Sequence, residues 1–240
     1  MRRGEARALK TTVLETWPVQ TIAPAAAARG YRKGGETRQR ILHAALKIFG
    51  AAGLKGATTR QIAEDAGVNL PALSYYFGGK EGLYVACAEE IVGRYQQRMR
   101  SLLTDVRADL KTRIAPARAR KLLKDVLSAL VDLQISNHEA DIWMSFVLRE
   151  IAEQGPAFDV LFKQLWAPGV DITAELISRI LGERSLSQAA RLQALLLMSS
   201  LTAFSIARPI ALRYLDWPDT RDARLARIKK AIGDQVERIS

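Results

Sequence analysis

Residues 58–84 read TTRQIAEDAGVNLPALSYYFGGKEGLY, and this stretch decides the fold of the first third of the chain. Its first half predicts a short helix that begins after a threonine cap and ends at Gly67, a residue suited to the left-handed conformation of helix ends. Its second half predicts another short helix, with Asn69 as cap and Pro71 in the first turn, where a missing N–H costs no helical hydrogen bond. Two short helices joined by the turn 67–69 make a helix-turn-helix.

The spacing of apolar residues predicts which side of this unit faces inward. Five side chains can form a small core between the two helices: Ile62, Ala66, Val68, Leu73 and Phe77. Five others remain near the outer face, at the N-terminal end of the second helix: Leu70, Pro71, Ala72, Ser74 and Tyr75. A recognition helix presents that end to the major groove of DNA, and its free N–H groups favour phosphate. Tyr75 and Tyr76 point about 100° apart, so one of them can instead be a core aromatic, and we expect Tyr76 to be the more buried.

Working outward, apolar periodicity and Gly or Pro punctuation predict an all-α fold of about nine helices. One helix precedes residue 58 and ends at Gly53. The segments expected to be helical after the turn at residues 78–79 are 80–105, 116–136, 139–154, 157–166, 170–182, 185–208 and 219–239. Pro168-Gly169 is expected to separate two of them. The domains predicted are a flexible basic arm (1–35), a helix-turn-helix DNA-binding domain (36–80) and a larger helical domain (81–240), which the family resemblance given below implies to be a ligand-binding and dimerisation domain.

Charge is concentrated near the N-terminus. The formal net charge is +11, and residues 1–80 hold 13 Lys or Arg against 5 Asp or Glu, a net of +8. Such a skew indicates a polyanionic partner such as nucleic acid or a membrane surface, although basic residues can also simply keep a chain in solution. Arg29, Arg32 and Lys33 directly precede the first helix, where they can reach phosphate or a minor groove or have no role.

Composition and motifs give little support to other classes of function. The single cysteine, Cys87, excludes an intrachain disulfide and suits a reducing cytosol, so we expect a cytoplasmic protein. The sequence contains no run of about 18 apolar residues, so we expect no membrane span. His43 and His138 lie at no metal-ligand spacing, and the stretch FGGKEG lacks the spacing and hydroxyl of a phosphate-binding loop. We therefore expect no enzyme activity, no metal and no cofactor.

Residues 36–84 resemble the DNA-binding domain of the TetR family of bacterial repressors. The similar elements are ILHAALKIFGAAGLKGATTRQIAEDAGV and YYFGGKEGLY, in which an aromatic pair, Phe77, Lys80 and Leu83 recur at one spacing. The resemblance implies phosphate contacts by Thr59, Ser74, Tyr75, Tyr76 and Lys80. It implies that Arg60, Leu70, Pro71 and Ala72 face base edges. The family often has an aromatic residue where this chain has Ser74, which puts that contact in doubt. Arg60 can make the bidentate contact that recognises guanine.

The C-terminal part is expected to be the regulatory half. The segments LREIAEQGPAFDVLFKQLWAP and ALRYLDW look similar to the subgroup that carries a CerR-type C-terminal domain. Residues 142–148 are apolar all round, which predicts a central, buried helix. Eight residues are candidates to line a ligand pocket: Trp143, Phe146, Arg149, Phe158, Phe162, Trp166, Met198 and Phe204. The aromatic residues among them can equally fill an ordinary core.

These features together predict a ligand-responsive transcriptional regulator, most simply a repressor. It would bind a palindromic double-stranded DNA operator as a homodimer and be released by a small-molecule effector. Residues 190–207 are too apolar for a solvent-facing helix, and Leu225, Ile228, Ile232, Val236 and Ile239 form an apolar stripe on the last helix. We expect both helices to form the dimer interface. The alternative is a constitutive DNA-binding protein without an inducer, which would need no pocket.

Overall fold

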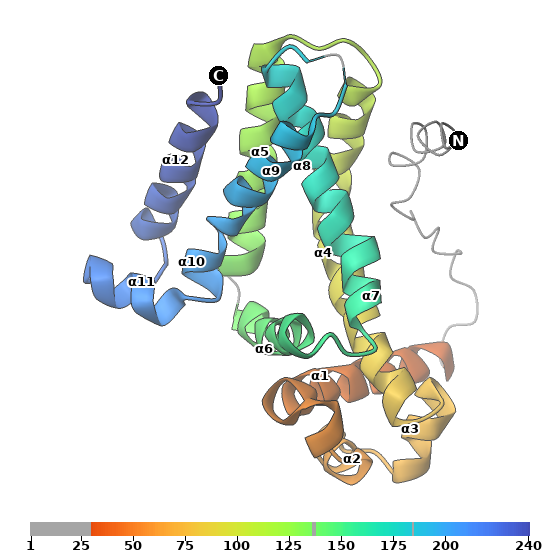
Figure 1. Ribbon diagram of the computed structural model, residues 1–240. Coiled ribbons are helices and arrows are strands. Elements are labelled where there is room, and N and C mark those ends of the chain that lie inside the picture. Colours follow the sequence, from red (N-terminus) through yellow and green to blue (C-terminus); the bar gives the residue numbers. More distant parts are fainter. Residues whose placement is uncertain (1–29, 136–137, 184) are drawn as a thin grey trace, which may run out of the picture.

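The computed structural model describes residues 30–135, 138–183 and 185–240, and this part of the chain is helical without any strand (Figure 1). Residues 1–29, most of the expected basic arm, lie outside the described residues. The last residues of that arm are not irregular, because the first helix already begins at Gly30. Helix α1 therefore includes residues 30–35 of the expected arm.

The helices follow one another with short connections. In chain order they are α1 (Gly30–Gly56), α2 (Thr59–Ala66), α3 (Leu70–Phe77), α4 (Lys80–Leu110), α5 (Pro116–Ile135), α6 (His138–Glu153), α7 (Phe158–Leu161), the π-helical turn η1 (Phe162–Trp166), α8 (Ala167–Ile180), α9 (Gln188–Ser199), α10 (Thr202–Ser205), α11 (Arg208–Leu215) and α12 (Ala223–Glu237).

Several of the expected boundaries differ from the structure, since α4 continues to Leu110 and most of α11 lies where no helix was expected. Pro168 does not separate two helices, because α7, η1 and α8 run on without a break and the wider π turn directly precedes the proline. The single helix expected over 185–208 is instead divided into α9 and α10. There the hydroxyls of Ser199, Ser200 and Thr202 donate to the carbonyls of Leu195, Leu197 and Ser199 at 2.8, 2.6 and 2.6 Å. Such bonds compete with the helical ladder.

Two hydrophobic cores are linked by one long helix. The first core joins α1, α2, α3 and the N-terminal half of α4 to α6 and α7. The second joins the C-terminal half of α4 to α5, α8, α9 and α12. The 31 residues of α4 span about 46 Å and pass from one core into the other (Figure 1).

Helix α6 lies across α1 and packs on the side of the N-terminal unit that faces the rest of the chain (Figure 1). The crossing is close at Gly50, where an added Cβ would lie 3.1 Å from Ser145 Cβ and 3.3 Å from the backbone nitrogen of Phe146. The absence of a side chain at Gly50 therefore allows α1 and α6 to pack closely. Arg149 fixes the same crossing by donating to the carbonyl of Ala51 at 3.0 Å.

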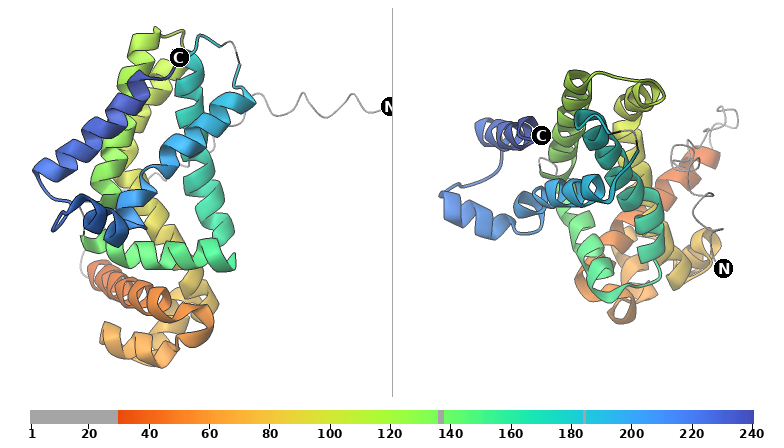
Figure 2. Two further views of the ribbon diagram at one scale, coloured as in Figure 1. Left: turned by 60° about the vertical axis from the view of Figure 1, so that its left-hand side comes forward. Right: turned by 45° about the horizontal axis from the view of Figure 1, so that its top comes forward.

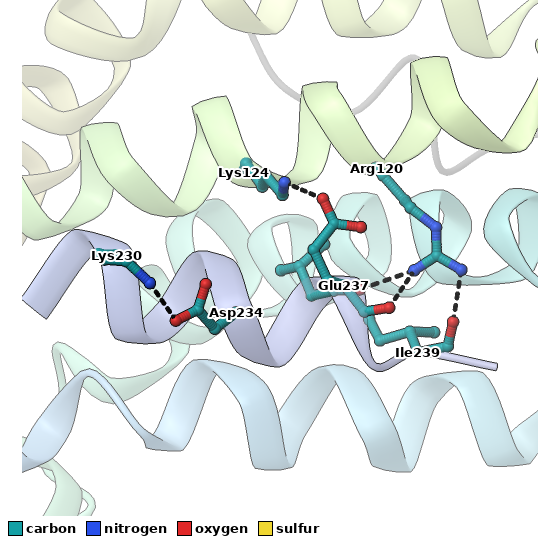
Figure 3. Close-up of polar contacts among 7 residues, drawn as sticks. Arg120, Lys124, Lys230, Asp234, Glu237 and Ile239 are labelled. Atoms are coloured by element: carbon teal, nitrogen blue, oxygen red, sulfur yellow. Dashed lines mark hydrogen bonds and ion pairs between the residues drawn. The ribbon is translucent and has the colours of Figure 1, made fainter.

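The last helix is bound to its own chain. The apolar residues Ile228, Ile232, Val236 and Ile239 of α12 are buried against the second core, and α12 packs on α5. The guanidinium of Arg120 donates to the carbonyls of Val236, Glu237 and Ile239 at 2.8, 3.2 and 2.6 Å, and Lys124 pairs with Glu237 (Figure 3). The expectation that this stripe faces a second chain is therefore wrong.

The apolar residues of α9 to α11, unlike those of α12, are not covered by the rest of the chain. Its side chains Leu192, Leu196, Ile210 and Tyr214 are exposed to solvent. No single helix in the described ranges is long and apolar enough to cross a membrane. The bent pair Gln188–Ser205 and Arg208–Leu215, with an angle of 76°, meets that length and composition only when taken together.

Candidate nucleic-acid interface and internal cavity

The two short helices α2 and α3 are closed by the local signals that the sequence contains. Thr58 caps α2, because its hydroxyl accepts from the backbone N–H of Gln61 at 3.2 Å while the Gln61 side chain accepts from the N–H of Thr58 at 3.0 Å. Gly67 ends α2 and Gly78 ends α3, both in the left-handed conformation with φ of 62° and 72°. The turn between the helices is thereby fixed by backbone geometry.

The buried side of this unit is the predicted one. Ile62, Ala66 and Leu73 are buried, while Val68 and Phe77 are half-buried at its edge. The guanidinium of Arg38 lies 5.3 Å from the centre of the Phe77 ring, which covers the outer side of that ring. The helix-turn-helix is thus attached to α1 mainly through α2, whereas α3 packs on α4 and meets α1 at the Arg38–Phe77 contact.

The opposite side of the unit carries the candidate DNA-contacting residues. Four of them are exposed on the surface of the two helices: Arg60, Leu70, Pro71 and Ser74. Tyr75 is 83% exposed, whereas Tyr76 is half-buried, as expected, and its ring meets that of Tyr75 edge to face at 5.1 Å. Thr59, Ala72 and Lys80 are half-buried at the margin of the same surface. All nine lie on α2, on α3 or at the first residue of α4.

The N-terminal unit as a whole is moderately basic, whereas α2, α3 and Lys80 together carry two basic and two acidic residues. Residues 36–80 contain six Lys or Arg and three Asp or Glu, so they account for less than half of the +8 of residues 1–80. Lys47 pairs with Asp65 at 2.9 Å, which removes one cation and one anion from the balance. The remaining excess suits phosphate, and the base-facing positions Leu70, Pro71 and Ala72 offer only apolar contacts.

The second candidate site is an internal cavity of about 470 Å³. It lies between α4, α5, α6, α7, η1, α8, α9 and α10. Four predicted residues line it: Trp143, Phe158, Trp166 and Met198. Sequence reasoning missed the α4 and α5 side of the wall, which includes Tyr95 and Gln134, because the helix faces that meet there are set by long-range packing. On α6, the lining residues Trp143, Met144, Val147 and Ile151 follow one helix face, a pattern readable from their spacing.

Four other predicted lining residues lie outside the cavity wall. Phe146 is buried beneath α6, with its ring 4.7 Å from that of Tyr84. Arg149 contacts Ala51 of α1 and pairs with Glu153 at 2.7 Å. Phe162 is largely exposed and stacks on Phe158 at 6.1 Å. Phe204 stacks on Trp217 at 6.1 Å. The physical reason is helix rotation, since neighbouring apolar positions on one helix face different cores.

The cavity wall is apolar, and among the residues that the structure describes no Lys, Arg, Asp or Glu belongs to it. Its polar members are Tyr95, Gln134, Ser199, Thr202 and Ser205. Burial raises the pKa of Tyr95 to about 12, while a hydrogen bond with Gln134 acts in the opposite direction. The hydroxyls of Ser199, Thr202 and Ser205 donate to the backbone carbonyls of Leu195, Ser199 and Leu201. The wall therefore offers few hydrogen-bonding groups and no charge to an occupant.

Helix α6 separates the cavity from the N-terminal unit. One face carries the lining residues, and the other carries Phe146, Arg149 and Glu150. Glu150 is fully buried and accepts a hydrogen bond of 2.6 Å from the Tyr84 hydroxyl of α4. One helix thus contacts both the cavity and the unit that carries the exposed surface of α2 and α3.

Comparison with known proteins identifies the two parts of the chain. Residues 41–87 match the family described as bacterial regulatory proteins, tetR family. Residues 119–240, just over half of the chain, match the C-terminal domain of the HTH-type transcriptional dual regulator CecR. The subgroup introduced above as CerR-type is therefore correctly named CecR-type.

Individual relatives agree with these families. The HTH-type transcriptional dual regulator CecR of Shigella flexneri is 26% identical over 209 residues, which cover 86% of this chain and 92% of that protein. A TetR-like transcriptional regulator from Rhodococcus sp. RHA1 has a TM-score of 0.57 at 20% identity, covering 84% of this chain and 94% of that one. FadR from Bacillus subtilis, solved in complex with stearoyl-CoA, has a TM-score of 0.53 at 16% identity, with coverages of 84% and 97%. The last two show a shared fold.

The helix-turn-helix, the helical body with its internal cavity and the two family matches lead to one conclusion. This chain belongs to the TetR family of transcriptional regulators, in the group with a CecR-type C-terminal domain.

Proposed function

We propose that this regulator is a repressor that binds a roughly palindromic operator as a homodimer and is released when a small molecule fills the internal cavity. The observation that carries the proposal is the pairing, in one chain, of an exposed helix-turn-helix surface with an uncharged cavity, on either side of α6. TetR-family regulators bind DNA and usually act as dimers with small-molecule effectors.

In this proposal the exposed surface of α2 and α3 enters the major groove. Arg60 supplies the bidentate contact to guanine, and Leu70, Pro71 and Ala72 meet thymine methyl groups or the edges of bases. Thr59, Ser74, Tyr75, Tyr76 and Lys80 contact phosphates and set the register. The exposure of Arg60 and Tyr75 supports these roles, because neither side chain is used in the core of the unit.

The cavity indicates the class of effector. A wall of Leu, Ile, Val, Met and aromatic side chains without any charged residue suits a neutral, mostly apolar compound. A charged group would lose its hydration there without gaining a partner. Tyr95 and Gln134 offer the hydrogen bonds that would orient such a compound. Arg149, considered from the sequence as an anchor, instead holds α6 on α1.

The link between the two sites runs through α6 and α4. An occupant that displaces Trp143 or Val147 moves the helix whose opposite face holds Phe146 and Glu150 against Tyr84. Because α4 continues into both cores, the two DNA-reading units of a dimer would change their separation. The effector can shift this equilibrium only by as much as it prefers the arrangement that does not bind DNA.

Selection of bound DNA from a random pool tests the proposal. We expect enriched sequences to contain two similar half-sites in inverted order, about one helical turn or a multiple of it apart. Enrichment of a single half-site would contradict the homodimer, and no enrichment would contradict sequence-specific binding.

A constitutive DNA-binding protein is the alternative. Neutral apolar compounds that raise the melting temperature and weaken binding to the selected DNA would exclude it. Compounds that bind without any effect on the DNA complex would favour it.

A further inference from the structure

The cavity opens to solvent on a particular side of the molecule. Among the residues that line it, five are also exposed: Ile151, Leu195, Ser199, Thr202 and Ile206. Four of the five lie on α9 and α10 or directly after α10. The mouth of the cavity is therefore set largely by α9 and α10.

This mouth is continuous with an exposed apolar face. On α9, Leu192 and Leu196 are 58% and 65% exposed and lie on the same stripe as the mouth residues Leu195 and Ser199. We call residues 192, 195, 196, 199, 202 and 206 the mouth face. Leucines at this spacing and exposure are unusual for a surface in contact with water.

Helix α11 extends the same apolar surface away from the body of the protein (Figures 1 and 2). It packs mainly on α10, and its residues Ile210 and Tyr214, one helical turn apart, are 73% and 87% exposed. A short helix that buries little of its own apolar surface needs a neighbour to stabilise it.

We propose that a second copy of this chain covers the mouth face, so that the effector cavity is completed only in the dimer. This inference rests on the homodimer of the proposed function and adds that the partner forms part of the cavity wall. The same stripe on both copies is suited to a two-fold contact, in which each surface packs on its equivalent.

Charge favours a second copy as the occupant. Residues 192–207 contain no charged side chain, so a two-fold contact centred there places no like charges opposite each other. Ser199 and Ala203 are small and exposed, which allows the two helices to approach closely. The apolar stripe of α12 is already used within the chain, whereas the mouth face and the neighbouring Ile210 and Tyr214 of α11 are exposed.

A regulatory consequence follows from this arrangement. A compound that touches both copies binds the dimer more tightly than the single chain, and by linkage it strengthens dimerisation by the same factor at each site. A tenfold preference at each of two cavities makes dimerisation about a hundredfold tighter at saturation. The effector would thus release DNA without separating the two chains.

The test compares the wild-type protein with Leu196→Glu and with the control Ala226→Glu. Leu196 belongs to the mouth face but does not line the cavity, and Ala226 is exposed on α12, so both variants add the same charge at an exposed position. Sedimentation velocity measures dimerisation, and Nile red fluorescence reports binding of a neutral apolar probe. We expect Leu196→Glu to dimerise at least tenfold more weakly and to bind Nile red at least tenfold more weakly, while Ala226→Glu matches the wild type.

Each other outcome overturns a defined part of the inference. A monomeric Leu196→Glu that binds Nile red like the wild type would mean that one chain completes its own cavity, and the homodimer would stand. A fully dimeric Leu196→Glu would place the interface elsewhere. A monomeric wild type would contradict the homodimer as well, whereas DNA selection tests the DNA-binding surface independently.

A second readout requires no cavity ligand. On a Cys87→Ser background, Ser199→Cys places a thiol at the mouth, and Ala108→Cys places one on the exposed side of α4. A short bismaleimide should link two chains through residue 199 and not through residue 108. Failure to link at residue 199 would overturn the closure of the mouth by a second copy, even if the protein were dimeric.

Discussion

The Tyr84 hydroxyl donates a hydrogen bond of 2.6 Å to Glu150 Oε1 inside the first core, and this contact joins α4 to α6. The second carboxylate oxygen, Oε2, has no hydrogen-bond partner among the described residues. The ring of Tyr84 also packs on Phe49 of α1 at 4.8 Å and on Phe146 of α6 at 4.7 Å. One residue of α4 thereby connects the N-terminal unit to the helix that forms the cavity floor.

Loss of this hydrogen bond should destabilise the protein. Tyr84→Phe removes the donor and leaves the buried Glu150 side chain without it, so we expect the free energy of unfolding to fall by about 1–3 kcal/mol. Tyr75→Phe removes an exposed hydroxyl and should change it by less than about 0.5 kcal/mol. Urea denaturation followed by circular dichroism measures both values. Equal effects would mean that the Tyr84–Glu150 contact contributes nothing to stability.

The buried acidic groups of this region predict loss of stability at alkaline pH. Burial, followed by the hydrogen bond to Glu150, raises the pKa of Tyr84, and burial raises the pKa of Tyr95 to about 12 and also raises the pKa of Cys87. Each group has a higher pKa in the folded state than in the unfolded state. At neutral pH it is protonated in both states, so its contribution to the free energy of unfolding does not change with pH there. Above about pH 9 to 10 the unfolded chain releases protons that the folded chain retains, and the free energy of unfolding falls.

Tyr84→Phe isolates one of these contributions. Between pH 9 and 11 the variant should lose stability less steeply than the wild type, by up to about 1.4 kcal/mol per pH unit. Denaturant unfolding at a series of pH values gives the two slopes. Parallel slopes would show that Tyr84 ionises equally easily in both states.

Helix α1 is kinked at Gly53, near its C-terminal end. Gly53 has φ of 70° and ψ of 177°, a region essentially restricted to glycine, and a Cβ there would lie 3.0 Å from Arg149 Cδ. Gly53→Ala should therefore cost about 1–3 kcal/mol. Gly93→Ala, at an exposed helical position with open space around it, should instead gain up to about 1 kcal/mol. Thermal unfolding of the two variants should shift in opposite directions.

The sequence predicted the helix-turn-helix well because its signals are local. The capping box at Thr58, the glycines at 67 and 78 and the proline at 71 each fix a helix end within a few residues. The family resemblance agreed with this reading, and the family matches now confirm it.

The cavity was predicted less completely because it depends on long-range contacts. Trp143 and Phe146 are only three residues apart, yet Trp143 lines the cavity whereas Phe146 packs on Tyr84 beneath it. Apolar periodicity identifies a buried stripe but not the neighbour that buries it. The stripe of α12 shows the same limit, since it is covered by α5 of the same chain.

Two variants should separate base recognition from phosphate contact. Arg60→Ala should weaken binding to the selected DNA by about 1–3 kcal/mol and relax the preference at one base pair. Lys80→Ala should weaken binding to all sequences alike and reduce the slope of log affinity against log salt by about one. Fluorescence anisotropy with single-substitution DNA gives both profiles. Unchanged specificity in Arg60→Ala would remove Arg60 from the base-reading surface.

The coupling of cavity to DNA binding is the central claim, and Gly169 allows a direct test of it. Gly169 lines the cavity within α8, and an added Cβ would lie in ordinary contact with Met198 Cε at 3.5 Å. Gly169→Leu should therefore narrow the cavity, and exclude the compound, without a clash at its Cβ. Gly93→Leu makes the same change at an exposed helical position and serves as the matched control.

The deciding measurement is the dissociation constant for the selected operator, with and without a neutral apolar compound that raises the melting temperature of the wild type. All three proteins should bind the operator with similar affinity in the absence of the compound. The compound should weaken binding at least tenfold for the wild type and Gly93→Leu and leave Gly169→Leu unaffected. If Gly169→Leu were released at the same compound concentration as the wild type, the cavity would not be the site that controls DNA binding.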